Sequence, residues 1–198
     1  MGKRYGLVID SERCIGCIGC WISCKMENSL DKGSGIRVDT VGGPHPDTPE
    51  GMYPNLSMSY MPVPCMQCDD PPCIDACPEE AIYKRRDGIV LVDEKKCNGC
   101  QVCIPACPYD ALIYDDNRNV VWKCTLCHQR IDDGLEPFCV VCCILNVISF
   151  GDLNDKESKV SKLISQRGAY TLKPEAGTAP AVYYCPDRVR SKEANMVR

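Results

Sequence analysis

The chain has 198 residues, a formal net charge of −4 and only two Phe and two Trp, so its purely hydrophobic core must be thin. The acidic balance gives no electrostatic basis for binding nucleic acid, and the longest nearly apolar run, residues 138–150, is too short to span a bilayer. Eighteen cysteines indicate a disulfide scaffold, zinc sites or iron–sulfur clusters, and their spacing decides among the three.

The first predicted elements lie before the second cysteine group. Residues 5–10 predict a β-strand, and the first cysteine group follows it as CIGCIGCWISC. Residues 31–64, which contain GGPHPDTPEG, predict a long loop. Because loops of that length in compact domains are usually functional or face a partner, we expect one of these roles for this segment.

The second and third cysteine groups belong to a repeated unit. CMQCDDPPCIDACP and CNGCQVCIPACP both end in Cys-Pro, and CPEEAIY at Cys77 matches CPYDALI at Cys107. Each unit continues through a hairpin signal to a Lys-Cys dipeptide. These dipeptides are Lys96-Cys97 and Lys123-Cys124. The sequence therefore predicts duplicated units.

The fourth cysteine group, CTLCHQRIDDGLEPFCVVCC, keeps the opening C-x2-C but stretches the middle gap to eleven residues. Cys142 and Cys143 compete for its closing position, and the C-x3-C offset from Cys139 favours Cys143. Residues 156–167 predict a short amphipathic helix, and the polar C-terminus beyond it predicts an extended arm lying on a partner. The lone Cys185 is expected to be a structural or incidental thiol.

The spacing C-x2-C-x2-C-x3-C, complete in the first and third groups, is typical of bacterial ferredoxins. Three thiolates on one tight loop can reach three corners of a single cubane cluster. The fourth cysteine begins a short outgoing helix and points toward a neighbouring cluster. Clusters are therefore expected in pairs, although this rule does not say which groups are partners.

Other interpretations explain the pattern less well. Zinc sites need two cysteines per arm, which leaves the third and fourth cysteines of every group unexplained. Cysteines two residues apart seldom meet disulfide geometry. Cys124-Thr-Leu-Cys127-His128 matches the haem c attachment pattern, but it occurs once and both cysteines are needed for the fourth group. His128 is expected to be a surface residue or a residue that supports the cysteine ligands from behind, and His45 a solvated loop residue. No catalytic motif of the chain's own is visible.

Taken in order, the four groups resemble the four-cluster iron–sulfur subunits of the dimethyl sulfoxide reductase family of molybdenum or tungsten enzymes. The resemblance covers nearly the whole chain, including YGLVIDSERCIGCIGCWISCKMEN, KCTLCHQRIDDGLEPFC and LKPEAGTAPAVYY, and is strongest to the small subunits of polysulfide and respiratory arsenate reductases. Cys142-Cys143-Ile144 departs from the Ala-Cys-Pro common in that family, which affects only the choice of ligand between the two cysteines. The expected fold is α+β, with duplicated bacterial 2[4Fe-4S] ferredoxin-like halves built of short helices and hairpins, plus an extended C-terminal arm.

This resemblance implies four [4Fe-4S] clusters bound on sixteen cysteines. The ligand sets are Cys14, Cys17, Cys20 and Cys143 (set A); Cys24, Cys124, Cys127 and Cys139 (set B); Cys65, Cys68, Cys73 and Cys107 (set C); and Cys77, Cys97, Cys100 and Cys103 (set D). Residues 1–54 and 108–150 would form the half with sets A and B, and residues 55–107 the half with sets C and D. Residues 151–198 would form a C-terminal helix and a partner-binding arm.

The resemblance implies a subunit that is not an enzyme on its own. It would carry electrons through the four clusters to or from a molybdenum or tungsten pterin in a large catalytic subunit. The resemblance does not decide whether the complex has a further membrane anchor subunit. The alternative is a free polyferredoxin-type electron shuttle, but the long loop and the arm exceed what a shuttle needs. No apolar segment follows the N-terminal basic residues, so we expect a cytoplasmic location, or export together with a signal-bearing catalytic subunit.

Overall fold

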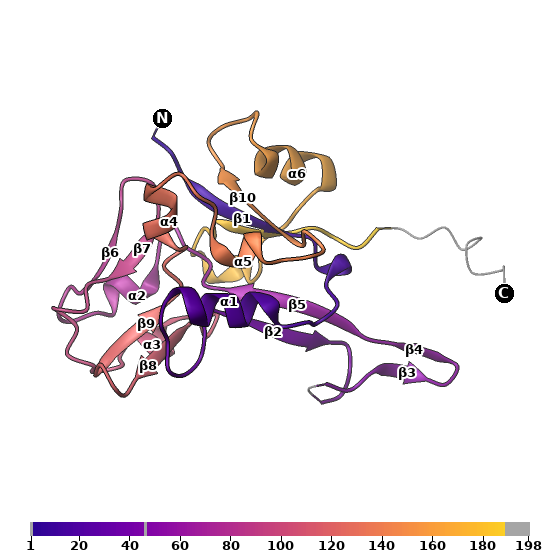
Figure 1. The fold of residues 1–198 in the computed structure, drawn as a ribbon, viewed down its shortest axis with the longest axis horizontal. Helices are drawn as coiled ribbons and strands as arrows, with labels where there is room; N and C mark the ends of the chain where they lie inside the picture. The colour runs from indigo at the N-terminus through magenta and orange to yellow at the C-terminus, as the bar shows by residue number, and fades with distance from the viewer. Residues whose placement is uncertain (1, 46, 189–198) are drawn as a thin grey trace.

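Short helices and small sheets make up the protein (Figure 1). The structure is a computed structural model that describes residues 2–45 and 47–188. Its two longest helices, α1 (Gly19–Glu27) and α6 (Lys159–Arg167), have nine residues each. One three-stranded sheet and four two-stranded sheets accompany the helices in this part of the chain, so the architecture is α+β, as predicted. No helix within these ranges is long and apolar enough to cross a membrane.

The three-stranded sheet is centred on β1 (Tyr5–Ile9), which confirms the predicted first strand. β1 runs antiparallel to β10 (Ile148–Asp152) and parallel to β11 (Val182–Tyr184). Leu7, Val8 and Ile9 are each at most 1% exposed. Because successive side chains of a strand point to opposite faces, Val8 contacts α6 through Val160 while Leu7 and Ile9 join the main core. The sheet therefore holds residues 5–9 and 182–184 against the cysteine-rich body.

The predicted amphipathic helix is present as α6. It begins after Ser158, whose Oγ accepts a hydrogen bond from the backbone N–H of Ser161 at 3.1 Å. It ends at Gly168, which adopts the left-handed conformation common after helix C-termini. Val160 is fully buried against the central sheet, so α6 covers one face of that sheet.

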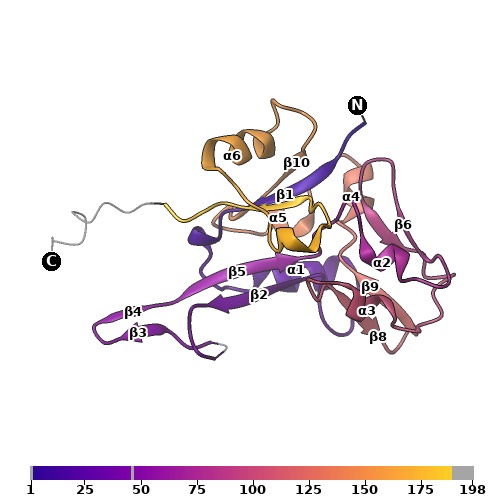
Figure 2. The same cartoon turned by 180° about the vertical axis from the view of Figure 1, so that it is seen from behind.

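The predicted long loop at residues 31–64 is instead largely β-structure. β2 (Ile36–Val41) pairs antiparallel with β5 (Ser59–Pro64), and a short hairpin of β3 (Glu50–Met52) and β4 (Asn55–Ser57) continues from them. Figures 1 and 2 show this ribbon projecting from the body. The Gly- and Pro-rich insert between β2 and β3 hides the strand alternation in the sequence. The expected boundary between residues 54 and 55 falls in the turn of this ribbon.

The repeated unit predicted around the second and third groups takes the same form twice. α2 (Pro72–Asp75) leads to the hairpin β6 (Ile82–Lys84) and β7 (Val90–Val92), and α3 (Cys103–Ala106) leads to β8 (Leu112–Asp115) and β9 (Val120–Lys123). Their apolar side chains share one cluster, which contains Ile82, Val90, Leu112 and Val121. The hairpin β8–β9 therefore packs on one side with the half expected at residues 55–107, while Trp122 and Ile113 pack with the main core. The division into halves itself stays a prediction.

The remaining elements close the body around the first cysteine group. η1 (Ser11–Arg13) precedes that group, and α5 (Phe138–Val141) packs against α1. α4 (His128–Asp132) follows the opening cysteines of the fourth group. Figure 1 shows α1 and α5 lying next to each other, although more than a hundred residues separate them in the chain.

The segment after α6 differs from the extended arm expected there. η2 (Pro174–Ala176) and β11 pack onto the body, and Val182 and Tyr184 are fully buried. The backbone N–H of Ala181 donates to the carbonyl of Met66 at 2.9 Å, and the hydroxyl groups of Tyr109 and Thr178 lie 2.7 Å apart. Most of residues 178–185 therefore contribute to this chain's own core, which an extended arm would not do. The rest of the expected arm, residues 189–198, falls outside the described residues.

Candidate iron–sulfur cluster sites

All four opening C-x2-C loops share one backbone feature. The residue just before the second cysteine has a positive φ in every loop, at Gly16 (69°), Gln67 (46°), Gly99 (74°) and Leu126 (54°). At Gly99 a Cβ atom would lie 2.7 Å from the carbonyl oxygen of Asn119, so glycine fits there for space as well as for conformation. At Gln67 and Leu126 the same turn costs about 1–3 kcal/mol of backbone strain, which the rest of the fold must offset.

The closing cysteines Cys77, Cys107 and Cys143 also share a local geometry. Each accepts a backbone hydrogen bond at its carbonyl from the residue three positions on, at 3.2, 3.3 and 3.0 Å respectively. These partner residues all have positive φ: Glu80, Asp110 and Asn146. Cys143 therefore occupies the position that Cys77 and Cys107 occupy in their own groups.

Cys142 is oriented differently from its neighbour Cys143. Its Sγ lies 3.0 Å from the Oγ of Ser23 in α1. The Sγ of Cys143 instead accepts from the backbone N–H of Val147 at 3.3 Å, as the Sγ of Cys77 accepts from Ala81 at 3.3 Å. The geometry thus agrees with the C-x3-C offset that favoured Cys143 as the ligand.

Three cavities each contain one complete predicted set of cysteines. One cavity is lined by all four members of set A together with Cys142. Two others are lined by all four members of set C and of set D. The cavities of sets A and C are bounded otherwise mostly by apolar side chains, such as Ile148 in the first and Val90 in the second, whereas polar and apolar side chains both line that of set D. Four thiols that line one cavity suit a cubane cluster with four thiolate ligands.

Set B comes together in the interior. Cys24, Cys124, Cys127 and Cys139 are all buried. Burial raises the pKa of the Cys139 thiol well above its usual value, and the neighbouring thiols Cys124, Cys127 and Cys24 raise that pKa further. The structure therefore places the members of set B close to one another, although two of them come from the fourth group's opening loop and one from α1.

Burial has a chemical consequence for cluster binding. It raises the pKa of the Cys20 and Cys73 thiols to about 12 and that of the Cys103 thiol to about 11. At neutral pH these groups are protonated in the absence of iron. Because iron binds the thiolate, cluster assembly must release these protons. The positive charge of the iron then stabilises the negative sulfur, which water would stabilise at an exposed site.

Neighbour contacts link the four sets as A to B, B to C and C to D. The Cys20 thiol of set A is near enough to raise the pKa of Cys139 in set B, and the Cys65 thiol of set C is near enough to raise the pKa of Cys124 in set B. Sets C and D share one hydrophobic cluster, which includes Cys73 and Cys103. The exposed cysteines belong to the first and last sets in this order: Cys17 in set A and Cys100 in set D.

Backbone N–H groups point at several of the predicted ligand sulfurs. Leu126 donates to the Sγ of Cys124 at 3.3 Å, and Val121 donates to the Sγ of Cys97 at 3.4 Å. Hydrogen bonds of this kind favour added negative charge on an iron–sulfur cluster and so raise its reduction potential. The strand ends and turns next to the cysteines thus contribute to the sites as well as holding them.

The cysteines outside the four sets have structural surroundings. Cys185 is 2% exposed and packs with Val8 and Val160 beneath α6, as expected for a structural thiol. None of the eighteen cysteines, all of which the structure describes, forms a disulfide. His128 begins α4, and burial and the nearby Arg85 lower its pKa.

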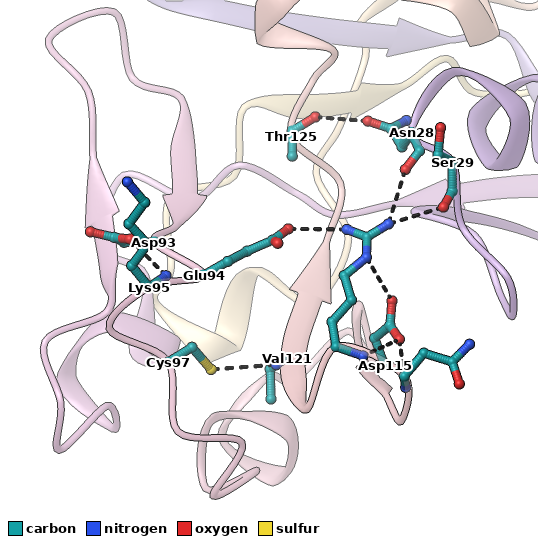
Figure 3. A network of polar contacts seen from close by, with 11 residues as sticks. Asn28, Ser29, Asp93, Glu94, Lys95, Cys97, Asp115, Val121 and Thr125 are labelled. Atoms are coloured by element: carbon teal, nitrogen blue, oxygen red, sulfur yellow. Dashed lines mark hydrogen bonds and ion pairs between the residues drawn. The ribbon is translucent and has the colours of Figure 1, made fainter.

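A polar network that the sequence did not predict joins the β8–β9 hairpin, near set D, to the end of α1, which contains Cys24 of set B (Figure 3). Arg118, in the β8–β9 turn, forms ion pairs with Glu94 at 3.1 Å and Asp115 at 3.3 Å. It also donates to the carbonyl of Ser29 at 2.9 Å, just beyond the end of α1. Nearby, Asn28 donates to the carbonyl of Cys24 at 2.8 Å. The network therefore links the hairpin beside set D to the helix that carries a ligand of set B.

Comparison with known proteins decides which class of cofactor the cysteines bind. The 4Fe-4S dicluster domain family matches residues 56–153. A Halobacterium salinarum protein, provisionally named as an iron–sulfur subunit of dimethyl sulfoxide reductase, is 44% identical over 91% of this chain and 78% of its own length. A sulfite dehydrogenase subunit of Allochromatium vinosum is 42% identical over 93% of this chain and 84% of its own, and a polysulfide reductase subunit of Wolinella succinogenes is 37% identical over 95% and 97%. The chain therefore belongs to the iron–sulfur subunits of the dimethyl sulfoxide reductase family.

Family membership confirms the resemblance inferred from the cysteine groups. As a member, the chain is an electron-transfer subunit of an oxidoreductase complex and not a catalyst on its own. Its cysteine groups serve iron–sulfur clusters of the 4Fe-4S type, which removes the zinc, disulfide and haem interpretations.

Proposed function

We propose that the protein binds four [4Fe-4S] clusters, one on each of sets A to D, with Cys143 and not Cys142 as the fourth ligand of set A. Each bound cluster supplies one-electron oxidation and reduction. The observation that carries the proposal is that the complete sets A, C and D each line one pocket, while all four cysteines of set B are buried. The repeated geometry of Cys77 and Cys107 supports the further proposal that the chain contains duplicated ferredoxin-like halves.

The chain's own residues hold the sets close together, exclude water from sets B and C and direct N–H groups at the sulfurs. They would thereby conduct single electrons between an exposed end near Cys17 and an exposed end near Cys100. At one end the partner would be a separate catalytic subunit with a molybdenum or tungsten pterin. The family's reductase and dehydrogenase names are compatible with either direction of electron flow.

Metal analysis tests the cluster count. Four clusters predict about sixteen iron and sixteen acid-labile sulfide atoms per chain in a preparation assembled without oxygen. Values near eight of each would reduce the count to two clusters. A fully loaded preparation that contained zinc in place of iron would overturn the proposal.

The catalytic partner is supported by the exposed apolar surface of the ribbon. Met52 and Tyr53 at the β3–β4 turn are 83% and 89% exposed, and Leu56 is 51% exposed. Such a group of large apolar side chains is typical of a binding surface, and a free shuttle has no need of it. Native purification should recover a larger pterin-containing chain with this one, whereas an active monomer without any partner would favour the shuttle.

The cellular compartment of the complex depends on whether the catalytic partner carries an export signal. We propose that the chain is cytoplasmic, or that it leaves the cytoplasm only when folded together with a catalytic subunit that carries an export signal. Fractionation of cells with and without that subunit distinguishes the two cases, because only co-export makes this chain's location depend on its partner.

A further inference from the structure

One charged side chain lies in the interior of the protein. Lys123, the last residue of β9, is 1% exposed, and it is the single Lys, Arg, Asp or Glu among the fully buried residues of the described chain. Its Nζ donates to the carbonyl oxygens of Val90 and of Cys124, the latter at 3.0 Å. Among the described residues no carboxylate forms an ion pair with it, so two neutral carbonyl groups are its hydrogen-bond partners.

A buried ammonium without a counter-ion is costly. Transferring a charged group into a low-dielectric interior destabilises a protein by several kcal/mol unless an opposite charge compensates it. Folded proteins therefore keep such groups where a negative charge is bound. The structure places this charge beside the sites expected to become negative, since an oxidised cubane with four thiolates carries a net charge of about −2.

Lys123 lies next to both inner sets, B and C. Its side chain lines the cavity that contains Cys65, Cys68, Cys73 and Cys107. Its Nζ also donates to the carbonyl oxygen of Cys124, a member of set B, at 3.0 Å. The residue that follows it in the chain, Cys124, is a member of set B. Lys123 thus stands between sets B and C and borders the cavity of set C.

A second buried side chain holds the ammonium in place. Gln67 is 1% exposed and lies in the opening loop of set C. Its Oε1 accepts from the backbone N–H of Val90 at 2.8 Å, and its Nε2 donates to the carbonyl of Cys124 at 2.8 Å. Gln67 and Lys123 therefore bind the same two residues, Val90 and Cys124. This shared bonding leaves the charged end of Lys123 little freedom to move away from the cavity.

We propose that Lys123 is a positioning residue for electron transfer, whose buried positive charge raises the reduction potential of the cluster on Cys65, Cys68, Cys73 and Cys107. One-electron reduction adds one negative charge to that cluster and requires no proton. A fixed positive charge nearby favours the added electron, and low-dielectric surroundings make its effect larger than at the surface. The inference rests on the proposed function, because it requires a cluster on set C.

The duplicated unit supplies a matched control. Lys96 precedes Cys97 as Lys123 precedes Cys124, but Lys96 is exposed to solvent. Water and salt screen an exposed charge, so its influence on the adjacent set D should be small. The same Lys-Cys dipeptide is therefore present once in the interior and once at the surface.

The experiment is a potentiometric titration of the intact complex, followed by EPR spectroscopy, on Lys123→Gln, Lys123→Arg and Lys96→Gln variants. Iron is measured first. Lys123→Gln should keep the full iron content and shift the midpoint potential of the set C cluster to a more negative value by at least about 59 mV, which is a tenfold change in a one-electron equilibrium constant. The shift of the set B cluster should be smaller, and a larger shift in set B than in set C would overturn the assignment to set C. Lys123→Arg keeps the charge and should remain near the unmodified potential, and Lys96→Gln should leave all four potentials unchanged. A Cys73→Ser variant, altered only in set C, identifies the shifted signal.

The outcomes separate this inference from the proposed function. Full iron with four unchanged potentials in Lys123→Gln would overturn the role of Lys123 and leave the four clusters standing. Equal shifts in Lys123→Gln and Lys123→Arg, or loss of iron from both, would show that packing and not charge is what Lys123 contributes, and would overturn it as well. Absence of iron from set C in the unmodified protein would overturn the proposed function itself.

Discussion

The inner sets B and C differ from the outer sets A and D in their exposure to water. Seven of the eight cysteines of the inner sets are buried, and Cys107 is intermediate. Among the eight of the outer sets only Cys20 and Cys103 are buried, while Cys17 and Cys100 are exposed. Sites with identical ligands therefore have different surroundings. The inner sets are part of the protein's core, and under the proposed function the outer sets would be the places where electrons enter and leave.

The largest expected effect is the loss of an inner ligand. Cys139→Ser should lower the iron content from about sixteen to about twelve atoms per chain or fewer. It should also lower the thermal midpoint by about 10 °C, since loss of a buried metal site costs several kcal/mol and each kcal/mol is worth about 2–4 °C in a domain of this size. Metal analysis and thermal unfolding measure the two effects.

Cys17→Ser is the matched control at the surface. An exposed ligand position can be taken by water or the serine hydroxyl, so we expect at most the loss of one iron atom and little change in thermal midpoint. Equal losses in both variants would show that burial does not distinguish inner from outer sets.

A smaller effect is expected within set A, where the adjacent cysteines can be compared directly. Cys143→Ser should convert one cluster to a three-iron form or reduce its iron, because three thiolates of that set remain. Cys142→Ala should leave the iron content and the reduced EPR spectrum unchanged and cost about 1 kcal/mol at most, from its contact with Ser23. The double variant guards against exchange of roles between the two thiols. Iron loss in Cys142→Ala alone would reverse the ligand assignment.

The exposed side chains around Cys17 provide a test of the outer end as a contact surface. Ile18 is 49% exposed and Ile144 is 74% exposed, and both line the cavity of set A. Ile144→Glu should weaken association with a partner at this end by about tenfold, while the iron content stays unchanged. The comparison variant Val102→Glu, beside Cys100 at the other end, should affect a different partner or none. Unchanged binding in both variants would indicate that the complex forms through other surfaces, such as the β3–β4 ribbon.

The smallest expected effect concerns the network around Arg118. Arg118→Met removes ion pairs with Glu94 and Asp115 and the bond to the carbonyl of Ser29. Because these groups are partly exposed, the loss should be about 1 kcal/mol, which lowers the thermal midpoint by about 2–4 °C without loss of iron. Lys32→Met, which removes a more exposed pair with Asp116, should have almost no effect. A loss of iron in Arg118→Met would show that the network positions ligands of set B or set D.

The cysteine spacing could predict the form of the cysteine loops because each loop is a local structure, while the assignment of ligands to clusters stays a prediction. Fixed offsets along the chain determine where a sulfur can point, and the closing geometry of Cys77, Cys107 and Cys143 repeats over four residues. The strand at residues 5–10 and the helix near residues 156–167 were also visible, since their apolar patterns are continuous.

Features that depend on distant contacts were not visible. The Gly- and Pro-rich insert made the ribbon look like a loop, because the paired residues Ile36 and Pro64 are far apart in the chain. Residues 178–185 looked like a polar arm, yet their bonds to Met66 and Tyr109 fix them in the core. The burial of Lys123 was equally hidden, because its local sequence matches that of exposed Lys96 and only the tertiary fold distinguishes them.

The central position of β1 between β10 and β11 has a consequence for how the protein matures. β1 is synthesised before both strands that flank it, and these strands follow much later in the chain. Under the proposed function, the cysteines of sets C and D are all made by residue 107, and the β8–β9 hairpin that helps to line their pockets is complete by residue 123, whereas set A must wait for Cys143. We infer an order of assembly in which the middle of the chain is loaded early and the N-terminal segment is sealed last. A ribosome stalled before residue 148 would therefore present a chain whose first strand is still unpaired and whose first cysteine group is still accessible to the cluster-insertion machinery.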